Sequence, residues 1–314
     1  MELLRGLAGL RPRHRPSVAT IGAFDGGHLG HQAVIAQLLE QGRLHDLPTT
    51  VVVFEPLPRE YLSPQSAPSR LQSLRGKFEA LSSLGVDLLL CLPFNEALRS
   101  MSAEAFVRSV FVEGLAIRAL VIGDDFRFGK EREGDAELIN EIGAREGFSA
   151  LPTDSVELDG ERVSSTRLRA TLADGDLELA SRLLGRSYAM VGRVVYGRQL
   201  GRTIGAPTAN ISLRVRKAAL TGVFAVSVSG AGLHGAPAIA NVGTRPTIAA
   251  GQRANLEVHL LDGSPDLYGE RLTVSFLHKL RDEQRFDSIE QLSARIAADI
   301  DSAKLWFSAR AKDE

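Results

Sequence analysis

The sequence predicts an α/β domain with a mainly parallel sheet, followed by a small antiparallel β-barrel with a C-terminal helix. Up to about residue 186, short apolar runs alternate with helical patterns, which is typical of a parallel sheet covered by helices. From residue 191 to residue 280, strand-like runs are instead separated by glycine and proline. A chain of 314 residues is also long for one domain. We therefore expect one domain over residues 1–186 and a second over residues 187–314.

The first half is expected to form a sheet with a ligand site at one edge. Apolar runs at residues 18–21, 50–54, 88–92 and 119–122 predict strands, and the patterns at residues 30–44, 71–84 and 103–115 predict helices. Ligands of such sheets bind beyond the carboxyl ends of the strands. His28, Glu55 and Asp124 each follow a predicted strand. We expect these side chains to face one cleft.

The second half is expected to form the barrel and its final helix. The predicted strands cover residues 191–195, 222–229, 238–242, 255–260 and 271–277. Ser288 and Gln291 have the spacing of a capping box, and an apolar stripe follows from Ile289 to Ile300. This pattern predicts a helix that packs on the barrel.

Composition narrows the class of protein. Hydrophobic residues make up 44% and charged residues 24% of the chain, as in ordinary soluble proteins, and a net charge of −1 gives no broad field for nucleic acid or anionic lipid. No apolar run approaches the roughly 18 residues of a membrane span. The single cysteine, Cys91, lies in an apolar run and is interpreted as a buried strand residue rather than a nucleophile. We expect a cytoplasmic monomer or weak homo-oligomer that acts on small molecules and binds neither nucleic acid nor membrane.

The string TIGAFDGGHLGH at residues 20–31 predicts a phosphate site. Glycines follow a predicted strand, and His28 and His31 lie where a helix should begin. A glycine-rich turn at a helix N-terminus brings backbone N–H groups close to an anion. Two histidines at this place favour a charged phosphate chain over a neutral ligand.

The pattern Gly-x-Phe-Asp-Gly-x-His-x-Gly-His at residues 22–31 resembles the HIGH signature of nucleotidylyltransferases, in the form found in FAD synthetases. VIGDDFRFGK at residues 121–130 resembles an element that lines the flavin site of that family. VSSTRLR at residues 163–169 resembles its loop over the triphosphate. The resemblance implies catalytic roles for His28 and His31. It also implies phosphate contacts from Gly22, Asp25, Gly30, Ser164, Ser165, Thr166 and Arg167, and flavin contacts from Asp125, Phe126 and Phe128.

These last two strings also allow plain structural interpretations. Phe126 and Phe128 can be core residues beside a tight turn. The hydroxyl residues at 164–166 can be an ordinary helix cap with a basic first turn.

A second set of motifs lies in the predicted barrel. Residues 192–210 hold glycines around arginines, which suit phosphate oxygens, and Thr208 and Asn210 present oxygen atoms that suit Mg²⁺. The string GRQLGRTIGAPTAN resembles bacterial riboflavin kinases, which implies ATP contacts from Gly201, Arg202 and Gly205. Glu257 is a lone acid in an apolar strand, a costly placement unless the acid is paired or functional, and we expect it to be the general base. A surface-facing glutamate is the alternative.

Arg281 and Glu283, in LRDEQRF, resemble a segment of the same family that lies near the isoalloxazine ring. The resemblance therefore reaches from residue 18 to about residue 286 and identifies a member of the prokaryotic bifunctional riboflavin kinase/FAD synthetase family. It implies that the barrel makes FMN from riboflavin and ATP. It further implies that the first domain makes FAD and pyrophosphate from FMN and ATP, with Mg²⁺ in both steps.

Three departures from the family pattern leave two other functions open. Gly27 stands where valine is usual in the family, and Leu57 stands where many relatives have histidine. Gly263 follows the LLD element at residues 260–262, where relatives often have an aromatic residue. The first half could instead be another adenylyl or cytidylyl transferase, because the His-x-Gly-His core is shared. Alternatively, one half could be a flavin-binding module without catalysis.

Overall fold

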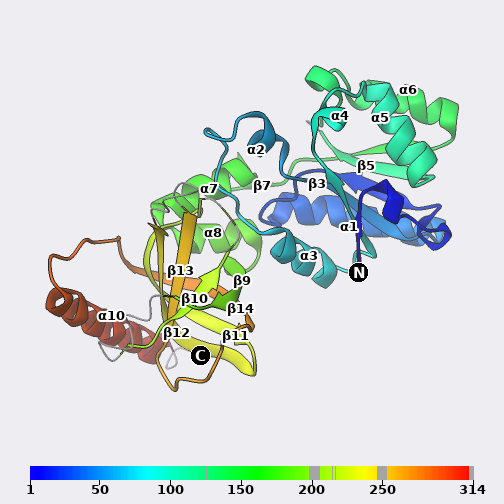
Figure 1. Ribbon diagram of the computed structural model, residues 1–314. Coiled ribbons are helices and arrows are strands. Elements are labelled where there is room, and N and C mark those ends of the chain that lie inside the picture. Colours follow the sequence, from blue (N-terminus) through cyan, green and yellow to red (C-terminus); the bar gives the residue numbers. More distant parts are fainter. Residues whose placement is uncertain (125, 198–205, 214, 216, 246–252, 311–314) are drawn as a thin grey trace. The chain divides into compact units, whose positions relative to one another are not determined.

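The computed structural model describes residues 1–124, 126–197, 206–213, 215, 217–245 and 253–310. The chain divides into two compact units, each described by itself below. The first consists of Met1–Pro68 and Lys77–Ser164, and the second of Ser69–Gly76 and Ser165–Glu314. Most helices and strands of both units are labelled in Figure 1.

The first unit contains a parallel sheet with the strand order β1-β4-β3-β2-β5-β6. All neighbouring pairs in this sheet run parallel, as predicted. The strands are β1 (Glu2–Arg5), β2 (Val18–Ile21), β3 (Thr49–Glu55), β4 (Leu88–Pro93), β5 (Ala119–Gly123) and β6 (Ser149–Thr153). Because β3, β2 and β5 are adjacent, their carboxyl ends share one edge of the sheet.

Helices cover both faces of this sheet (Figure 1). They are α1 (Leu29–His45), α4 (Glu96–Arg99), α5 (Ala103–Val107) with the continuing π-helical turn Arg108–Gly114, and α6 (Ala136–Glu146). A short helix, α2 (Pro58–Leu62), and a β7–β8 pair (Glu157–Leu158 and Glu161–Arg162) lie outside the sheet. Phe106, Phe111 and Ile139 pack in a core cluster with alternate strand residues such as Val52 and Leu120. Cys91 is buried in β4, as expected.

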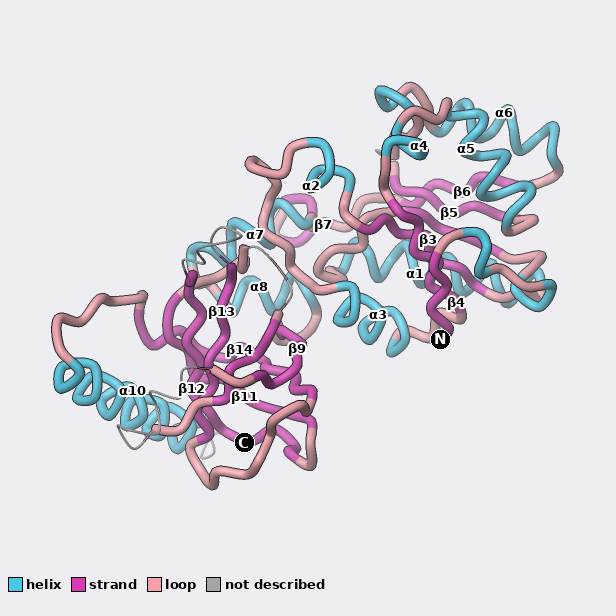
Figure 2. The backbone as a smooth tube through the Cα atoms, viewed as in Figure 1, coloured by secondary structure: helices cyan, strands magenta, loops and turns pink. Residues whose placement is uncertain are grey.

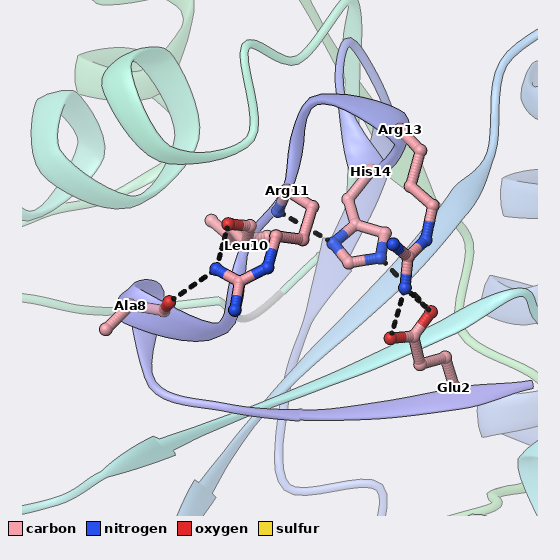
Figure 3. Close-up of polar contacts among 6 residues, drawn as sticks. All are labelled: Glu2, Ala8, Leu10, Arg11, Arg13 and His14. Atoms are coloured by element: carbon pink, nitrogen blue, oxygen red, sulfur yellow. Dashed lines mark hydrogen bonds and ion pairs between the residues drawn. The ribbon is translucent and has the colours of Figure 1, made fainter.

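The N-terminal strand β1 was not predicted, because Glu2 and Arg5 interrupt any apolar run. Contacts with residues further along the chain hold it in place (Figure 3). The ring of His14 is buried; its Nδ1 accepts from the backbone N–H of Arg11 at 3.0 Å, and its Nε2 lies 3.1 Å from a carboxylate oxygen of Glu2. Arg13 donates to the same carboxylate at 3.0 Å. Tertiary contacts, rather than local propensity, decide this strand.

The second unit is a closed antiparallel barrel with the strand order β10-β13-β12-β11-β14-β9 (Figure 2). The strands are β9 (Ala189–Val195), β10 (Ala209–Ser212), β11 (Gly222–Gly230), β12 (Leu233–Arg245), β13 (Arg253–Leu260) and β14 (Arg271–Arg281). Helices α7 (Ser165–Asp174), α8 (Leu177–Leu184) and α10 (Ile289–Arg310) belong to the same unit. Helix α3 (Leu74–Ser83) begins in its short segment 69–76, where the carbonyl of Leu71 accepts from the hydroxyl of Tyr188 at 2.9 Å. The predicted barrel fold is confirmed.

The final helix packs on the barrel, as predicted, through the C-terminal end of the predicted stripe and the residues that follow it. Ala303, Ile300 and Trp306 contact the cluster around Ala225 and Ile239, whereas Ile289 is exposed. Ser288 caps the helix by accepting from the N–H of Gln291 at 3.2 Å. The reciprocal bond of Gln291 goes to the N–H of Asp287 and not to that of Ser288.

Candidate active sites

The glycine-rich loop between β2 and α1 makes a tight turn. Gly26 and Gly27 have φ values of +101° and +62°, which favour glycine. Gly30 lies in the first turn of α1, where a Cβ would come within 3.3 Å of both the His28 ring and the carbonyl oxygen of Val163. The loop therefore packs closely against the helix start and against the segment that leads to Ser164.

The two histidines of this loop form one stacked pair. His28 is the N-cap of α1, and its Nδ1 accepts from the backbone N–H of His31 at 3.3 Å, so the proton of the neutral ring is on Nε2. The two rings stack with centroids 3.7 Å apart, and the ring of Phe24 lies 5.0 Å from that of His31. A ring N–H donor beside a helix N-terminus suits a phosphate oxygen.

Two buried charged residues belong to the surroundings of this loop. Asp25 is 1% exposed, and Lys77 of α3 is 4% exposed. The ammonium of Lys77 donates a hydrogen bond to the carbonyl oxygen of Ala23. Sequence analysis did not single out Lys77, because its burial depends on a partner 54 residues away; a lysine within an otherwise amphipathic helical pattern was the available signal.

The residue that follows β5 is tied to the β7–β8 hairpin. Asp124 accepts from the hydroxyl of Ser155 at 2.6 Å and from Arg162 at 2.8 Å. Glu55 ends strand β3, which is separated from β5 by β2, and is half-buried. A shared cleft for His28, Glu55 and Asp124 stays a prediction, supported by the common edge of their strands.

The two phenylalanines of the GDDFRFG string differ in exposure. Phe128 is buried in the core cluster and pairs with Gly134 through backbone hydrogen bonds of 2.9 and 3.1 Å. Phe126 is half-buried and stacks on Phe128 with centroids 5.3 Å apart. The arrangement places Phe128 as a support and leaves Phe126 as the ring with accessible surface. Asp125 lies outside the described residues.

The string VSSTRLR spans the boundary between the two units. Ser164 is the last residue of the first unit, and Ser165, Thr166 and Arg167 open α7 in the second. Arg169 donates from Nε to the carbonyl oxygen of Ser69 at 2.6 Å, within the second unit. Phosphate contacts from residues 164–167 stay predictions.

A row of polar residues crosses three neighbouring barrel strands. In the strand register, Glu257 of β13 is the partner of Asn210 on β10 and of Asn241 on β12. Partners in register point to the same face, opposite to the buried residues Leu256 and Val258. The register therefore brings the predicted base and one predicted metal ligand together on the outer face of the barrel.

Asn255, which sequence analysis missed, and Gly197, the first residue of the GRQLGRTIGAPTAN string, hold this row. Asn255 donates from its amide to Oε1 of Glu257 at 2.9 Å. A Cβ at Gly197 would lie 2.2 Å from the amide nitrogen of Asn210, so glycine is needed there for Asn210 to keep its place. Asn210 is 7% exposed. Asn255 lies two residues before Glu257 on the same strand, and such residues share a face of the sheet. This spacing is the sequence signal that could have identified Asn255.

A pocket of about 600 Å³ borders strands β9, β10 and β13 of the same barrel. Thr208 lines it together with apolar residues from three strands, among them Val194 and Val258. Tyr196 and Tyr268 also line it, and their rings stack with centroids 4.1 Å apart. Tyr196 is 75% exposed. The stacked rings form a flat aromatic surface in the same pocket as Thr208, a predicted cation ligand. This combination suits a nucleotide.

Thr208 and Asn210 fit a hard cation by their donor chemistry, a hydroxyl and an amide oxygen, which Mg²⁺ accepts together with phosphate oxygens and waters. Among the residues that the structure describes, no group of three or more His, Cys, Asp or Glu forms a metal site. Gly201, Arg202 and Gly205 lie outside the described residues. Their predicted ATP contacts stay predictions.

Arg281 faces the C-terminal helix. Its Nε and Nη2 donate to the carboxylate of Asp299 on α10 at 2.7–3.0 Å, and its Nη1 donates to the carbonyl of Asp282. The pair is buried, with side chains 11% and 5% exposed. Arg281 thus anchors α10 to the end of β14, and a flavin contact from it stays a prediction.

Glu283, the other residue predicted near the flavin, lies against Gly243 of β12. A Cβ at Gly243 would lie 2.0 Å from its carboxylate. Desolvation in this position raises the pKa of the Glu283 carboxyl, and Arg281 opposes the shift.

Asp299→Asn is expected to lower the stability of the second unit by about 3 kcal/mol, because it leaves the buried guanidinium of Arg281 without its carboxylate. This corresponds to a loss of roughly 6–12 °C in the melting temperature, measured by calorimetry. Asp301→Asn, an exposed position on the same helix, is the control. Equal melting of the two variants would contradict the anchoring role.

The comparisons with known proteins cover both units. A FAD synthetase family model matches residues 10–167, and a riboflavin kinase family model matches residues 184–307. A bifunctional riboflavin kinase/FMN adenylyltransferase of Pseudomonas fluorescens is 50% identical over 304 residues, which is 97% of each chain. This chain belongs to the bifunctional riboflavin kinase/FMN adenylyltransferase family. The Escherichia coli K12 member is 46% identical over 308 residues and 98% of each chain.

A solved structure supports the fold of this family member over nearly its whole length. A crystal structure described as a macrolide-efflux protein from Streptococcus pneumoniae matches with a TM-score of 0.78. The match covers 97% of this chain and 99% of that chain at 30% sequence identity. Within the described part of this chain, no helix is both long and apolar enough to cross a membrane.

Proposed function

We propose that this chain phosphorylates riboflavin to FMN and adenylylates FMN to FAD, using ATP in both steps. The adenylyl transfer is assigned to residues 1–186 and the phosphorylation to residues 187–314. The observation that carries the proposal is the presence of two clusters of motif residues on one chain. The stacked His28–His31 pair forms one, and the Asn210–Glu257 row forms the other.

For the kinase step, Glu257 is the general base. A ribityl hydroxyl has a high pKa, so a carboxylate within hydrogen-bond reach assists its attack on the γ-phosphate. Asn255 fixes one oxygen of that carboxylate at 2.9 Å. Mg²⁺, when bound by Thr208 and Asn210, supplies charge neutralisation of the phosphates. Gly201, Arg202 and Gly205 would add the ATP contacts that the family resemblance implies.

The pocket lined by Thr208, Tyr196 and Tyr268 is the place for the nucleoside part of ATP. Thr208 is at once a pocket residue and a proposed cation ligand, so a nucleotide in the pocket has its phosphates directed to the row. The stacked rings of Tyr196 and Tyr268 offer a flat surface for the base.

Tyr196→Ala is expected to raise the KM for ATP in the kinase reaction about tenfold, because stacking of a base on an aromatic ring contributes about 1–3 kcal/mol. The adenylyl transfer on the same chain should keep its KM for ATP. The measurement is a steady-state titration of ATP in both reactions, with Leu305→Ala, another exposed apolar residue of this unit, as the control. An unchanged KM for ATP in the kinase reaction of Tyr196→Ala would contradict the placement of the adenine ring in this pocket.

For the adenylyl transfer, no general base is needed. A phosphate monoester has a second pKa of about 6 and is mostly a dianion at neutral pH, so the FMN phosphate can attack the α-phosphate of ATP directly. The site must align the two phosphates and stabilise the developing charge. Nε2–H of His28 and the N-terminus of α1 supply donors for this task, and Phe126 supplies ring surface for the flavin.

Product release distinguishes this function from the two alternatives. Purified protein is given ATP with FMN, with riboflavin, or with no flavin, and also CTP with FMN; pyrophosphate and ADP are measured. We expect pyrophosphate with ATP and FMN, and ADP with ATP and riboflavin. Pyrophosphate from a substrate other than FMN would favour a different nucleotidylyltransferase. Flavin binding without either product would favour a binding module.

The composition of the chain also supports a proposal for the cellular location and the oligomeric state of the enzyme. We place it in the cytoplasm as a monomer or weak homo-oligomer that acts on small molecules rather than nucleic acid. A net charge of −1 and a single buried cysteine agree with this placement. Light scattering across a range of protein concentrations tests the oligomeric state.

A further inference from the structure

Lys77 has no part in the chemistry described above, although its position is costly. It is 4% exposed, and a buried ammonium is unfavourable unless its N–H groups are paired. It also lies in the first turn of α3, whose cap Ser73 accepts from the N–H of Gly76 at 3.1 Å. The helix dipole disfavours a cation at this end. Two unfavourable effects at one residue indicate a specific task for the ammonium.

The partner of Lys77 lies in the turn that precedes the histidine pair. Its ammonium donates to the carbonyl oxygen of Ala23. This carbonyl and the nitrogen of Phe24 belong to one planar peptide unit, so holding the oxygen fixes the plane from which the chain turns at Phe24. Phe24 has a φ of +44°, a backbone conformation that is strained for a bulky L-residue. The bond from Lys77 offsets part of this strain.

The turn is connected to the catalytic rings by direct packing. Phe24 is 3% exposed, and its ring centroid lies 5.0 Å from that of His31. The ring of His31 stacks in turn on that of His28 at 3.7 Å. A rotation of the Ala23 peptide would move Phe24 and, through it, both imidazoles.

We propose that Lys77 is a positioning residue for adenylyl transfer. Its ammonium holds the Ala23 peptide in the orientation that sets Phe24, and thereby places the rings of His28 and His31 at the phosphate site. It acts through the loop and not on the substrate. This role rests on the assignment of FMN adenylylation to the same site.

The first test uses Lys77→Met, which keeps most of the side-chain length and removes the charge and the donors. We expect the kcat of FAD formation from FMN to fall about 30- to 100-fold, since a small misplacement of a catalytic group has an effect of this size. The KM values for ATP and FMN should change less than about threefold. FMN formation on the same chain should stay at the wild-type rate. Arg99→Met, which removes an exposed cation from the same unit, is the matched control.

Chemical rescue shows whether the cation itself is required. In Lys77→Ala, n-propylammonium replaces the missing part of the side chain, and we expect it to restore FAD formation at least tenfold. 1-Propanol has a similar size without the charge and should not restore it. FAD formation within threefold of wild type in Lys77→Met would overturn the proposal. Loss of both activities together with earlier melting would overturn it as well.

A spectroscopic measurement decides the role independently of turnover. The imidazole signals of His28 and His31 are assigned by NMR from the variants His28→Asn and His31→Gln, without substrates. Lys77→Met should shift both signals, and Arg99→Met should shift neither. Unchanged signals in Lys77→Met would refute positioning. If the wild-type protein makes no FAD from FMN, the proposed function fails, and these spectra still decide the action of Lys77 on the rings.

Discussion

Glu257→Gln is expected to lower the rate of FMN formation by about 10²- to 10⁴-fold, because it removes the carboxylate that accepts the proton of the ribityl hydroxyl. Glutamine has nearly the same shape and can keep a contact with Asn255, whose amide lies 2.9 Å from Oε1 in the wild type. The variant should therefore fold and bind riboflavin. Its adenylylation of added FMN should stay within twofold of the wild-type rate.

The measurement is initial-rate chromatography of flavins with riboflavin or FMN as the starting substrate. Glu270→Gln, an exposed glutamate of the same unit, is the matched control and should leave both rates unchanged. Kinase turnover near the wild-type rate in Glu257→Gln would show that another group is the base. Loss of both activities would indicate damage to the fold.

The double variant His28→Asn/His31→Gln is expected to show the opposite pattern. It should lower FAD formation from FMN by about 10²- to 10³-fold, since it removes imidazole donors from the phosphate site. Asparagine at position 28 can still accept from the N–H of residue 31, as His28 does at 3.3 Å, so the helix cap is kept. FMN formation from riboflavin should continue at the wild-type rate.

His45→Gln is the control for this pair, because His45 is exposed at the far end of the same helix. Pyrophosphate release with FMN and ATP gives the rate directly. An unchanged rate in the double variant would show that the two histidines do not form the phosphate site. A fall confined to KM would assign them to substrate binding rather than to the transition state.

The sequence predicted those parts of the fold that are encoded locally. The apolar runs predicted the central parallel strands, and His28 stands at the start of α1, where the glycine-rich string placed a helix N-terminus. The barrel was likewise predicted from its short strands. These features follow from side-chain periodicity and turn chemistry within a few residues.

Other features depend on partners far along the chain and could not be predicted in this way. The polar strand β1 is held by pairing with β4 and by contacts of Glu2 with Arg13 and His14. Strand β12 extends well beyond the predicted residues 238–242, because pairing with β11 and β13 continues through Pro237 and Gly243.

The candidate sites show the same division. Motif residues were predicted, but their arrangement depends on register, which brings Asn210 and Asn241 beside Glu257 on adjacent strands. Nothing in the local pattern around Arg281 indicated that it would be bound to Asp299, 18 residues later. Lys77 was missed because its contact with the carbonyl of Ala23 joins residues 54 positions apart in the chain.

The most direct measurement follows the flavins over time in wild-type protein incubated with riboflavin, ATP and Mg²⁺. The bifunctional assignment predicts that FMN appears first and then gives way to FAD, with ADP released in the first step and pyrophosphate in the second. FMN that accumulates without FAD would contradict the assignment for the first unit. Riboflavin that stays unconverted, while added FMN is turned into FAD, would contradict it for the barrel.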